Sequence, residues 1–175
     1  MQNKKSLLKI TYTAIFTAII MLCTMLIKFS TGLGEGYIHF GDCFIYLSAC
    51  VLPFPYCLVA SAIGGALADI LGGYAVWAIP TAIIKILIAL PFMAICRRNK
   101  TAKILNIKVA LMTIISGVIS IIGYFIAECI LYSVPSATLS ILGNTIQAVS
   151  SGILFIIVAG ALDKMNFKSR IFKGV

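Results

Sequence analysis

The chain consists mostly of long apolar segments, separated by short stretches of charged and turn-forming residues. Apolar residues make up 61% of its 175 residues, and charged residues make up only 11%. A soluble domain carries roughly 25% charged residues, so this chain has too few charges to cover a water-exposed surface. The composition excludes a soluble enzyme, a secreted disulfide-rich domain and a disordered chain, and it predicts an integral membrane protein.

Six of the apolar segments are candidates for helices that span the membrane. Such a helix needs about 20 mostly apolar residues, and six of them fit into the chain with short loops. We expect helices at residues 10–29, 42–52, 56–71, 78–96, 109–132 and 139–162. The second is too short to cross at full thickness, so it must tilt or lie in a thinned region. The predicted fold is an all-α integral membrane protein with six transmembrane helices in a single membrane domain, residues 1–175.

The basic residues predict which side of the membrane each end of the chain occupies. Twelve of the 14 lie in three clusters: Lys4, Lys5 and Lys9; Arg97, Arg98, Lys100, Lys103 and Lys108; Lys164, Lys168, Arg170 and Lys173. The positive-inside rule places all three clusters, and therefore both termini, in the cytoplasm. The net charge of +9 then reflects topology and the lipid surface, and nucleic acid is not an expected partner. The first apolar run has no small-residue cleavage site, and we interpret it as a retained helix.

Polar residues form stripes along three consecutive predicted helices. The stripes are Trp77, Thr81 and Lys85; Ser116, Ser120, Tyr124 and Glu128; and Asn144, Gln147 and Ser151. These spacings put each set on one face of its helix, which predicts a shared polar cavity in the outer half of the protein. An ionised residue inside the bilayer costs several kcal/mol unless it is paired or hydrated. We therefore expect Lys85 to pair with Asp69 or Glu128, or to contact a ligand.

The loop of residues 30–41 is rich in glycine and contains His39, the only histidine. It is either a flexible lid over an outer pocket or an ordinary connector, with Asp42 as the N-cap of the next helix. The tyrosines of this loop and of the later 72–77 turn are expected near the same outer level. The candidate substrate-binding residues are Tyr37, His39, Asp69, Tyr74, Trp77, Thr81, Lys85, Glu128, Asn144 and Gln147.

Several kinds of chemistry have no support in the sequence. No nucleophile stands beside a base, so we assign no catalytic residue and expect no enzyme. The six cysteines have unrelated spacings, so we expect neither a metal nor a cofactor and interpret all six as small buried apolar residues. The alternatives are a self-sufficient secondary transporter, coupled to protons through Glu128 or Asp69, and an intramembrane enzyme. The lack of an internal repeat counts against the first, and the scattered acids count against the second.

Small residues follow one face of the first predicted helix and one face of the third. Ala14 and Ala18 are four residues apart, as are Ala60, Gly64 and Ala68. Such faces let helices approach closely in lipid. On the third helix we expect packing within the chain. On the first, packing within the chain and docking of a partner are both open.

Four of these patterns, in this order, resemble the substrate-binding S-components of energy-coupling factor (ECF) transporters. They are Ala14-x-x-x-Ala18, G-Y-I-H-F-G-D at 36–42, G-G-A-L-A-D-I-L-G-G-Y at 64–74 and P-T-A-I-I-K at 80–85. The resemblance is to the branch with hydroxymethylpyrimidine or pyridoxine-type substrates.

The resemblance implies a capture subunit in the bacterial plasma membrane. It implies that a vitamin-like molecule binds from outside, and that Ala14 and Ala18 dock on a transmembrane coupling subunit. Two cytoplasmic ATPases would supply the energy. The chain itself has no phosphate-binding Gly-rich loop, so ATP hydrolysis is expected of the partners.

Overall fold

The computed structural model describes residues 2–26, 28–30, 37–98 and 103–172. Its helices are α1 (Gln2–Met25), α2 (Gly41–Val51), α3 (Tyr56–Leu71), α4 (Ala78–Arg98), α5 (Ile107–Leu131), α6 (Val134–Lys164) and α7 (Phe167–Phe172), with a 3-10 turn η1 (Ala75–Trp77). Strands β1 (Lys28–Ser30) and β2 (Tyr37–His39) pair antiparallel. In the described part, α1, α4, α5 and α6 are long and apolar enough to cross a membrane, and α2 and α3 are apolar but shorter. These helices confirm the prediction that the chain is a helical membrane protein.

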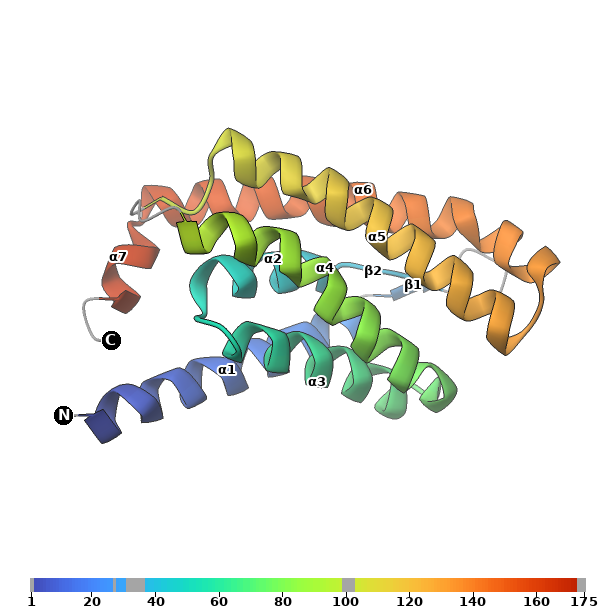
Figure 1. Ribbon diagram of the computed structural model, residues 1–175, viewed down its shortest axis with the longest axis horizontal. Helices are drawn as coiled ribbons and strands as arrows, with labels where there is room; N and C mark the ends of the chain where they lie inside the picture. The colour runs from blue at the N-terminus through green and yellow to red at the C-terminus, as the bar shows by residue number, and fades with distance from the viewer. Residues whose placement is uncertain (1, 27, 31–36, 99–102, 173–175) are drawn as a thin grey trace.

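The helices pack in chain order around a central α2. Helix α1 lies against α3, α3 against α4, α4 against α5, and α5 against α6. Figure 1 shows α5 and α6 side by side along one edge, α1 and α3 along the other, and both termini at the same end. Helix α2 contacts α1, α3, α4 and α6, so it joins the two edges of the molecule.

Helix α2 is enclosed by protein over nearly its whole length. Ten of its 11 residues are buried, as expected of a helix that is apolar all round. At 1.5 Å per residue it is about 17 Å long, well short of a hydrocarbon core of about 30 Å. The short segment is therefore sheltered by its neighbours, and the β1–β2 hairpin precedes it.

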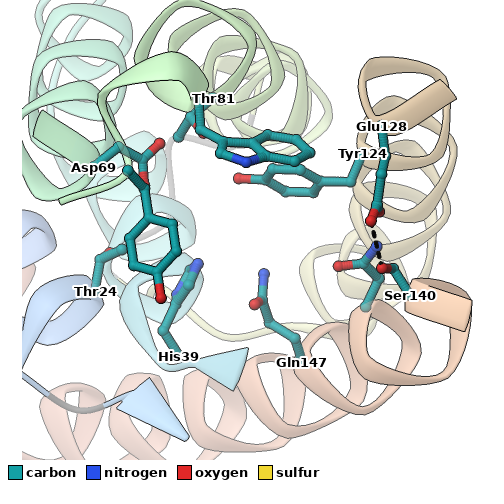
Figure 2. A pocket seen from close by; sticks show the side chains of 11 residues that line it. Thr24, His39, Asp69, Thr81, Tyr124, Glu128, Ser140 and Gln147 are labelled. Carbon is teal, nitrogen blue, oxygen red and sulfur yellow. Dashed lines mark hydrogen bonds between the residues drawn. The ribbon is translucent and has the colours of Figure 1, made fainter. Parts of the chain in front are cut away.

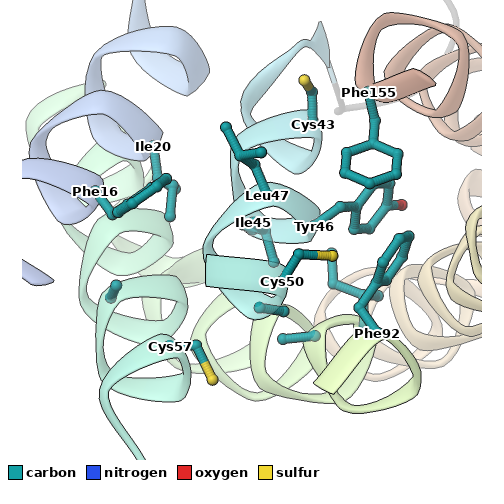
Figure 3. Close-up of a cluster of buried hydrophobic side chains, with 14 of the residues drawn as sticks. Phe16, Ile20, Cys43, Ile45, Tyr46, Leu47, Cys50, Cys57, Phe92 and Phe155 are labelled. Atoms are coloured by element: carbon teal, nitrogen blue, oxygen red, sulfur yellow. The ribbon is translucent and has the colours of Figure 1, made fainter. Parts of the chain in front are cut away.

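The apolar core is centred on three aromatic rings that pack against one another (Figure 3). Tyr46 of α2 stacks on Phe92 of α4 with ring centroids 4.5 Å apart. Phe155 of α6 meets Phe92 edge-on at 5.1 Å. Such offset and edge-to-face pairs add about 0.5–1.5 kcal/mol each beyond area burial. The rings hold α2, α4 and α6 together about one to two turns below the polar residues of the same helices.

Helix α1 begins at Gln2, eight residues before its predicted start. Two further predicted boundaries are wrong for identifiable reasons. Helix α1 ends at Met25 instead of residue 29, because residues 28–30 pair with β2. Helix α6 begins at Val134 instead of residue 139, because Ser133 caps it by accepting a hydrogen bond from the Ser136 N–H. Pro135 lies in the first turn of α6, where proline's missing N–H would have no partner anyway.

A carboxylate at the end of α6 holds the loop that follows α4. The two oxygens of Asp163 accept hydrogen bonds from the backbone N–H groups of Ile104 (2.6 Å) and Leu105 (2.8 Å). Charge-assisted bonds of this kind are roughly twice as strong as neutral ones. The only acidic residue at this end of the molecule in the described part therefore has a structural partner.

Two of the six cysteines meet between α2 and α4, which corrects the view that all six are simply buried apolar side chains. The Sγ atoms of Cys50 and Cys96 lie 3.1 Å apart, and Cys96 is only partly buried.

Copper-phenanthroline oxidation should link Cys50 and Cys96, because their side chains need to move only slightly to reach bonding geometry. Counting alkylatable thiols under denaturing conditions should show two fewer after oxidation. Cys50→Ser or Cys96→Ser should abolish that loss, and an unchanged thiol count in the unsubstituted protein would contradict this packing of α2 on α4.

Candidate ligand-binding site

A pocket lies at the end of the bundle opposite the two termini. Side chains from α1, β2, α3, η1, α4, α5 and α6 converge on it, and Figure 2 shows them pointing into a common space. The lining residues are Thr24, His39, Asp69, Tyr74, Trp77, Thr81, Tyr124, Glu128, Ser140, Asn144 and Gln147. Segments far apart in the sequence thus contribute polar groups to one cavity in an otherwise apolar molecule.

Eight of the ten residues proposed from the sequence line this pocket. They are His39, Asp69, Tyr74, Trp77, Thr81, Glu128, Asn144 and Gln147. The side chain of Tyr37 lies outside the described residues, as do residues 31–36 of the expected lid. Lys85 does not line the pocket, because an acidic partner holds it beneath the lining.

The partner of Lys85 is Asp42, and not Asp69 or Glu128 as expected. The Lys85 Nζ donates to Asp42 Oδ1 at 2.6 Å, and both side chains are 0% exposed. The amide of Gln147 donates to the other oxygen of Asp42 at 3.1 Å. The stem of Lys85 fits against α3 because residue 65 is glycine: a Cβ there would lie 2.8 Å from Lys85 Cγ. The network joins α2, α4 and α6 at the floor of the pocket.

Asp42 is therefore not the N-cap that the sequence suggested. Phe40 occupies the cap position and makes no side-chain cap bond. The N–H of Gly41 donates instead to Nδ1 of His39 at 3.1 Å. A side chain at Gly41 would collide with the hydroxyl of Thr24. The close approach of this turn to α1 frees the Asp42 carboxylate to face Lys85.

His39 in strand β2 is held as a neutral ring. Burial, and next the positive charge of Lys85, lower the pKa of His39 to about 3. Nδ1 accepts a hydrogen bond from the Gly41 N–H, and Nε2 lies 3.5 Å from the ammonium group of Lys85. His39 thus contributes no positive charge to the pocket at physiological pH.

Glu128 lies at the opposite side of the pocket, near the α5–α6 turn. Its Oε1 accepts hydrogen bonds from the hydroxyls of Ser140 (2.8 Å) and Ser136 (3.0 Å). Glu128 is 2% exposed. These bonds fix the carboxylate at the pocket wall, and Figure 2 shows the bond to Ser140 as a dashed line.

Aromatic rings cover the part of the wall between Glu128 and the floor. The Trp77 ring lies 6.0 Å from the rings of both Tyr124 and Tyr132, centroid to centroid. Lys85 Nζ lies 5.1 Å from the centroid of Tyr124, a cation–π distance. Trp77 is the only tryptophan in the chain.

Four residues of the site were missing from the sequence prediction. Ser140 lies four residues before Asn144 and seven before Gln147, so the periodicity of α6 could have found it. Tyr124 belonged to the predicted stripe of α5. Asp42 and Thr24 carried no such signal, because their places depend on how α1 and the hairpin pack. The deeper ends of the stripes serve packing: Ser116 donates to the carbonyl of Ile88 at 2.7 Å.

The two small-residue faces have different surroundings. On α3, Ala60, Gly64 and Ala68 are buried, and a Cβ at Gly64 would lie 2.9 Å from Cβ of Ile20 on α1. On α1, both Ala14 and Ala18 are exposed. They line a groove with residues of α1 and α3: Ile10, Thr13, Thr17, Met21, Pro55, Tyr56, Val59, Ile63 and Leu67. The α1 face is thus left open on the side of the molecule.

Comparisons with known proteins agree with this architecture. The family model for the S component of ECF-type riboflavin transporters matches residues 4–164. A Pyrococcus woesei protein, described as an uncharacterized protein in the gap 3' region, is 29% identical over 152 residues. That match covers 87% of this chain and 96% of the relative. With nearly its whole length matched, this multi-pass membrane chain belongs to the S-component family of ECF-type riboflavin transporters.

Proposed function

We propose that this chain is the substrate-capture subunit of an ATP-driven ECF-type transporter that takes up a vitamin or vitamin precursor. The observation that carries the proposal is the pocket itself: polar and aromatic side chains from seven elements meet at one end of an apolar bundle. Such concave sites with a few convergent polar groups are typical of small-molecule binding. Family membership supplies the transport context.

The pocket is proposed to open to the outside of a bacterial plasma membrane. The positive-inside rule favours cytoplasmic termini, and the pocket lies at the end of the bundle opposite the termini. Uptake then requires a partner that moves the loaded subunit, since the sequence contains no phosphate-binding loop of its own.

The groove between α1 and α3 is the proposed docking surface for the transmembrane coupling subunit. Its lining is apolar apart from Thr13, Thr17 and Tyr56, and both threonine hydroxyls donate to carbonyls of α1 itself. Exposed Ala14 and Ala18 would let a helix of that subunit approach the α1 backbone closely. Two cytoplasmic ATPases complete the proposed assembly.

The proposed ligand is a small flat heterocycle. Trp77 offers a ring face for stacking, and Asn144 makes no hydrogen bond within the described residues, so its amide remains for a ligand. The sequence patterns favour a hydroxymethylpyrimidine or pyridoxine-type compound. The name of the matching family makes riboflavin the second candidate.

Reconstitution into liposomes tests the proposal against its alternatives. Radiolabelled candidate vitamins should accumulate only when the coupling subunit and both ATPases are present. ATP must also be supplied on the side of the membrane that the ATPases face. The chain alone should bind the vitamin without accumulating it. Accumulation by the chain alone under a proton gradient would identify a secondary transporter, and chemical conversion of the vitamin would identify an enzyme.

A further inference from the structure

Among the residues that the structure describes, the buried carboxylate of Glu128 has no positively charged partner. It is 2% exposed, and its hydrogen bonds come from two neutral hydroxyls. The described residues contain no Lys, Arg or His within ion-pair distance of it. An uncompensated charge in such a place is strongly unfavourable. A carboxylate held at a pocket wall under these conditions is poised for a cation that comes from outside the chain.

The described part of the lining does not supply that cation. No lysine or arginine is among the described residues that line the pocket, and the ammonium group of Lys85 is held by Asp42 at 2.6 Å. His39 is kept neutral by its burial, as its lowered pKa indicates. Asp69 also lines the pocket, but it has interactions of its own, so Glu128 carries the argument. The pairing of Lys85 with Asp42, rather than with Glu128, leaves the wall acidic instead of neutral.

The groups beside Glu128 suit a positively charged flat ring. Trp77 is 8% exposed and lies in the same lining. The faces of aromatic rings attract cations, most strongly in tryptophan. Asn144 lies four residues after Ser140 on α6, and it can donate or accept one more hydrogen bond. A carboxylate, an indole face and an amide thus line one side of the cavity.

We propose that the pocket binds an organic cation, either a protonated amine or a positively charged heterocycle, with Glu128 as its carboxylate partner. The inference rests on the proposed capture function and adds the charge of the ligand. Ligand binding then brings the missing positive charge to Glu128, and Ser136 and Ser140 orient the carboxylate toward it.

Trp77 provides the measurement. As the only tryptophan, and one that lines the pocket, its emission reports occupancy of the site in the purified full chain. One probe is thiamine, which is a permanent cation. Two others are pyridoxamine and pyridoxine, which differ only in that pyridoxamine has an amine where pyridoxine has a hydroxyl. Riboflavin is the neutral probe, followed by its own fluorescence, and pantothenate is the anionic probe. The tightest binder should be a cation, and pyridoxamine should bind more tightly than pyridoxine.

Glu128→Gln should weaken binding of the best cation by about ten- to a hundredfold, the range for a charged hydrogen bond. Asp163→Asn is the matched control: it makes the same chemical change at the other end of the molecule and should leave affinity unchanged. In the ligand-free protein, Glu128→Gln should raise the melting temperature, because it removes an unpaired buried charge while both serine bonds persist. That readout does not depend on any probe.

The proposal fails if riboflavin or pantothenate binds most tightly and keeps its affinity in Glu128→Gln. It also fails if no cation binds, or if the substitution lowers the melting temperature of the empty protein. A neutral or anionic vitamin that is nevertheless accumulated with ATP would leave the transport function intact and refute only the charge of the ligand. Tight cation binding without ATP-dependent uptake would support the charge of the ligand and refute the transport function.

Discussion

Replacing Lys85 with Met should destabilise the protein by about 3–5 kcal/mol, the usual result of removing one partner of a buried ion pair. The substitution keeps most of the side-chain volume, so the loss reports the charge and not a cavity. Asp42 would keep only the hydrogen bond from Gln147 and would stay buried without its cation. Thermal unfolding of the purified protein in detergent, followed by the accessibility of its buried thiols, measures the effect.

The double variant Lys85→Met with Asp42→Asn should recover most of that stability, because no uncompensated charge is left. Lys108→Met is the matched control for the single change, since Lys108 is exposed and its loss should shift unfolding by less than about 0.5 kcal/mol. Equal destabilisation in the single and double variants would mean that packing around the Lys85 stem, and not the ion pair, holds this region together.

Ala14→Trp or Ala18→Trp should abolish most ATP-driven uptake while leaving substrate binding by the isolated chain intact. Both side chains are exposed in the α1–α3 groove, so an indole there does not disturb the chain's own packing but keeps a partner helix away. Overpacking of a close contact costs about 1–3 kcal/mol, which is about five- to 150-fold in affinity for the coupling subunit. Uptake into liposomes and co-purification with the coupling subunit measure the loss.

Ile157→Trp on α6 is the control for these variants. Ile157 is 63% exposed on a different spanning helix, so the same bulky side chain there should leave uptake unchanged. Loss of substrate binding in Ala14→Trp or Ala18→Trp would instead show that the α1 face is needed for folding. Normal uptake in both would place the coupling subunit elsewhere on the molecule.

The helices themselves were predictable from the sequence because apolar runs and turn residues are local signals. The ends of α1 and α6 were not, since they depend on strand pairing with residues 37–39 and on the cap formed by Ser133. Helix α2 was recognised as too short, but its shelter at the centre of the bundle comes from long-range packing. A sequence pattern contains no information about which helices will surround a given segment.

The pocket, like the fold, was predictable from the sequence only in part. The stripes of α4, α5 and α6 predicted which faces turn inward, and the structure brings most of those residues into one lining. The partner of Lys85 could not be predicted, because three acids lay at a similar depth. Asp42 was chosen over Asp69 and Glu128 by the tight turn at Gly41 and the close approach of α3 at Gly65. Both are consequences of packing between segments far apart in the chain.

The central position of α2 sets the order in which the protein can assemble during synthesis. Helix α2 is too short to be held stably by lipid alone, and its buried face meets α4 and α6 as well as α1. The ribosome makes α6 last of these, so the bond from Gln147 to Asp42 cannot form until α6 has been synthesised. Until then the insertion machinery must shelter a segment that carries an aspartate. The pocket, whose lining includes Ser140, Asn144 and Gln147 of α6, therefore forms only when α6 packs over α2.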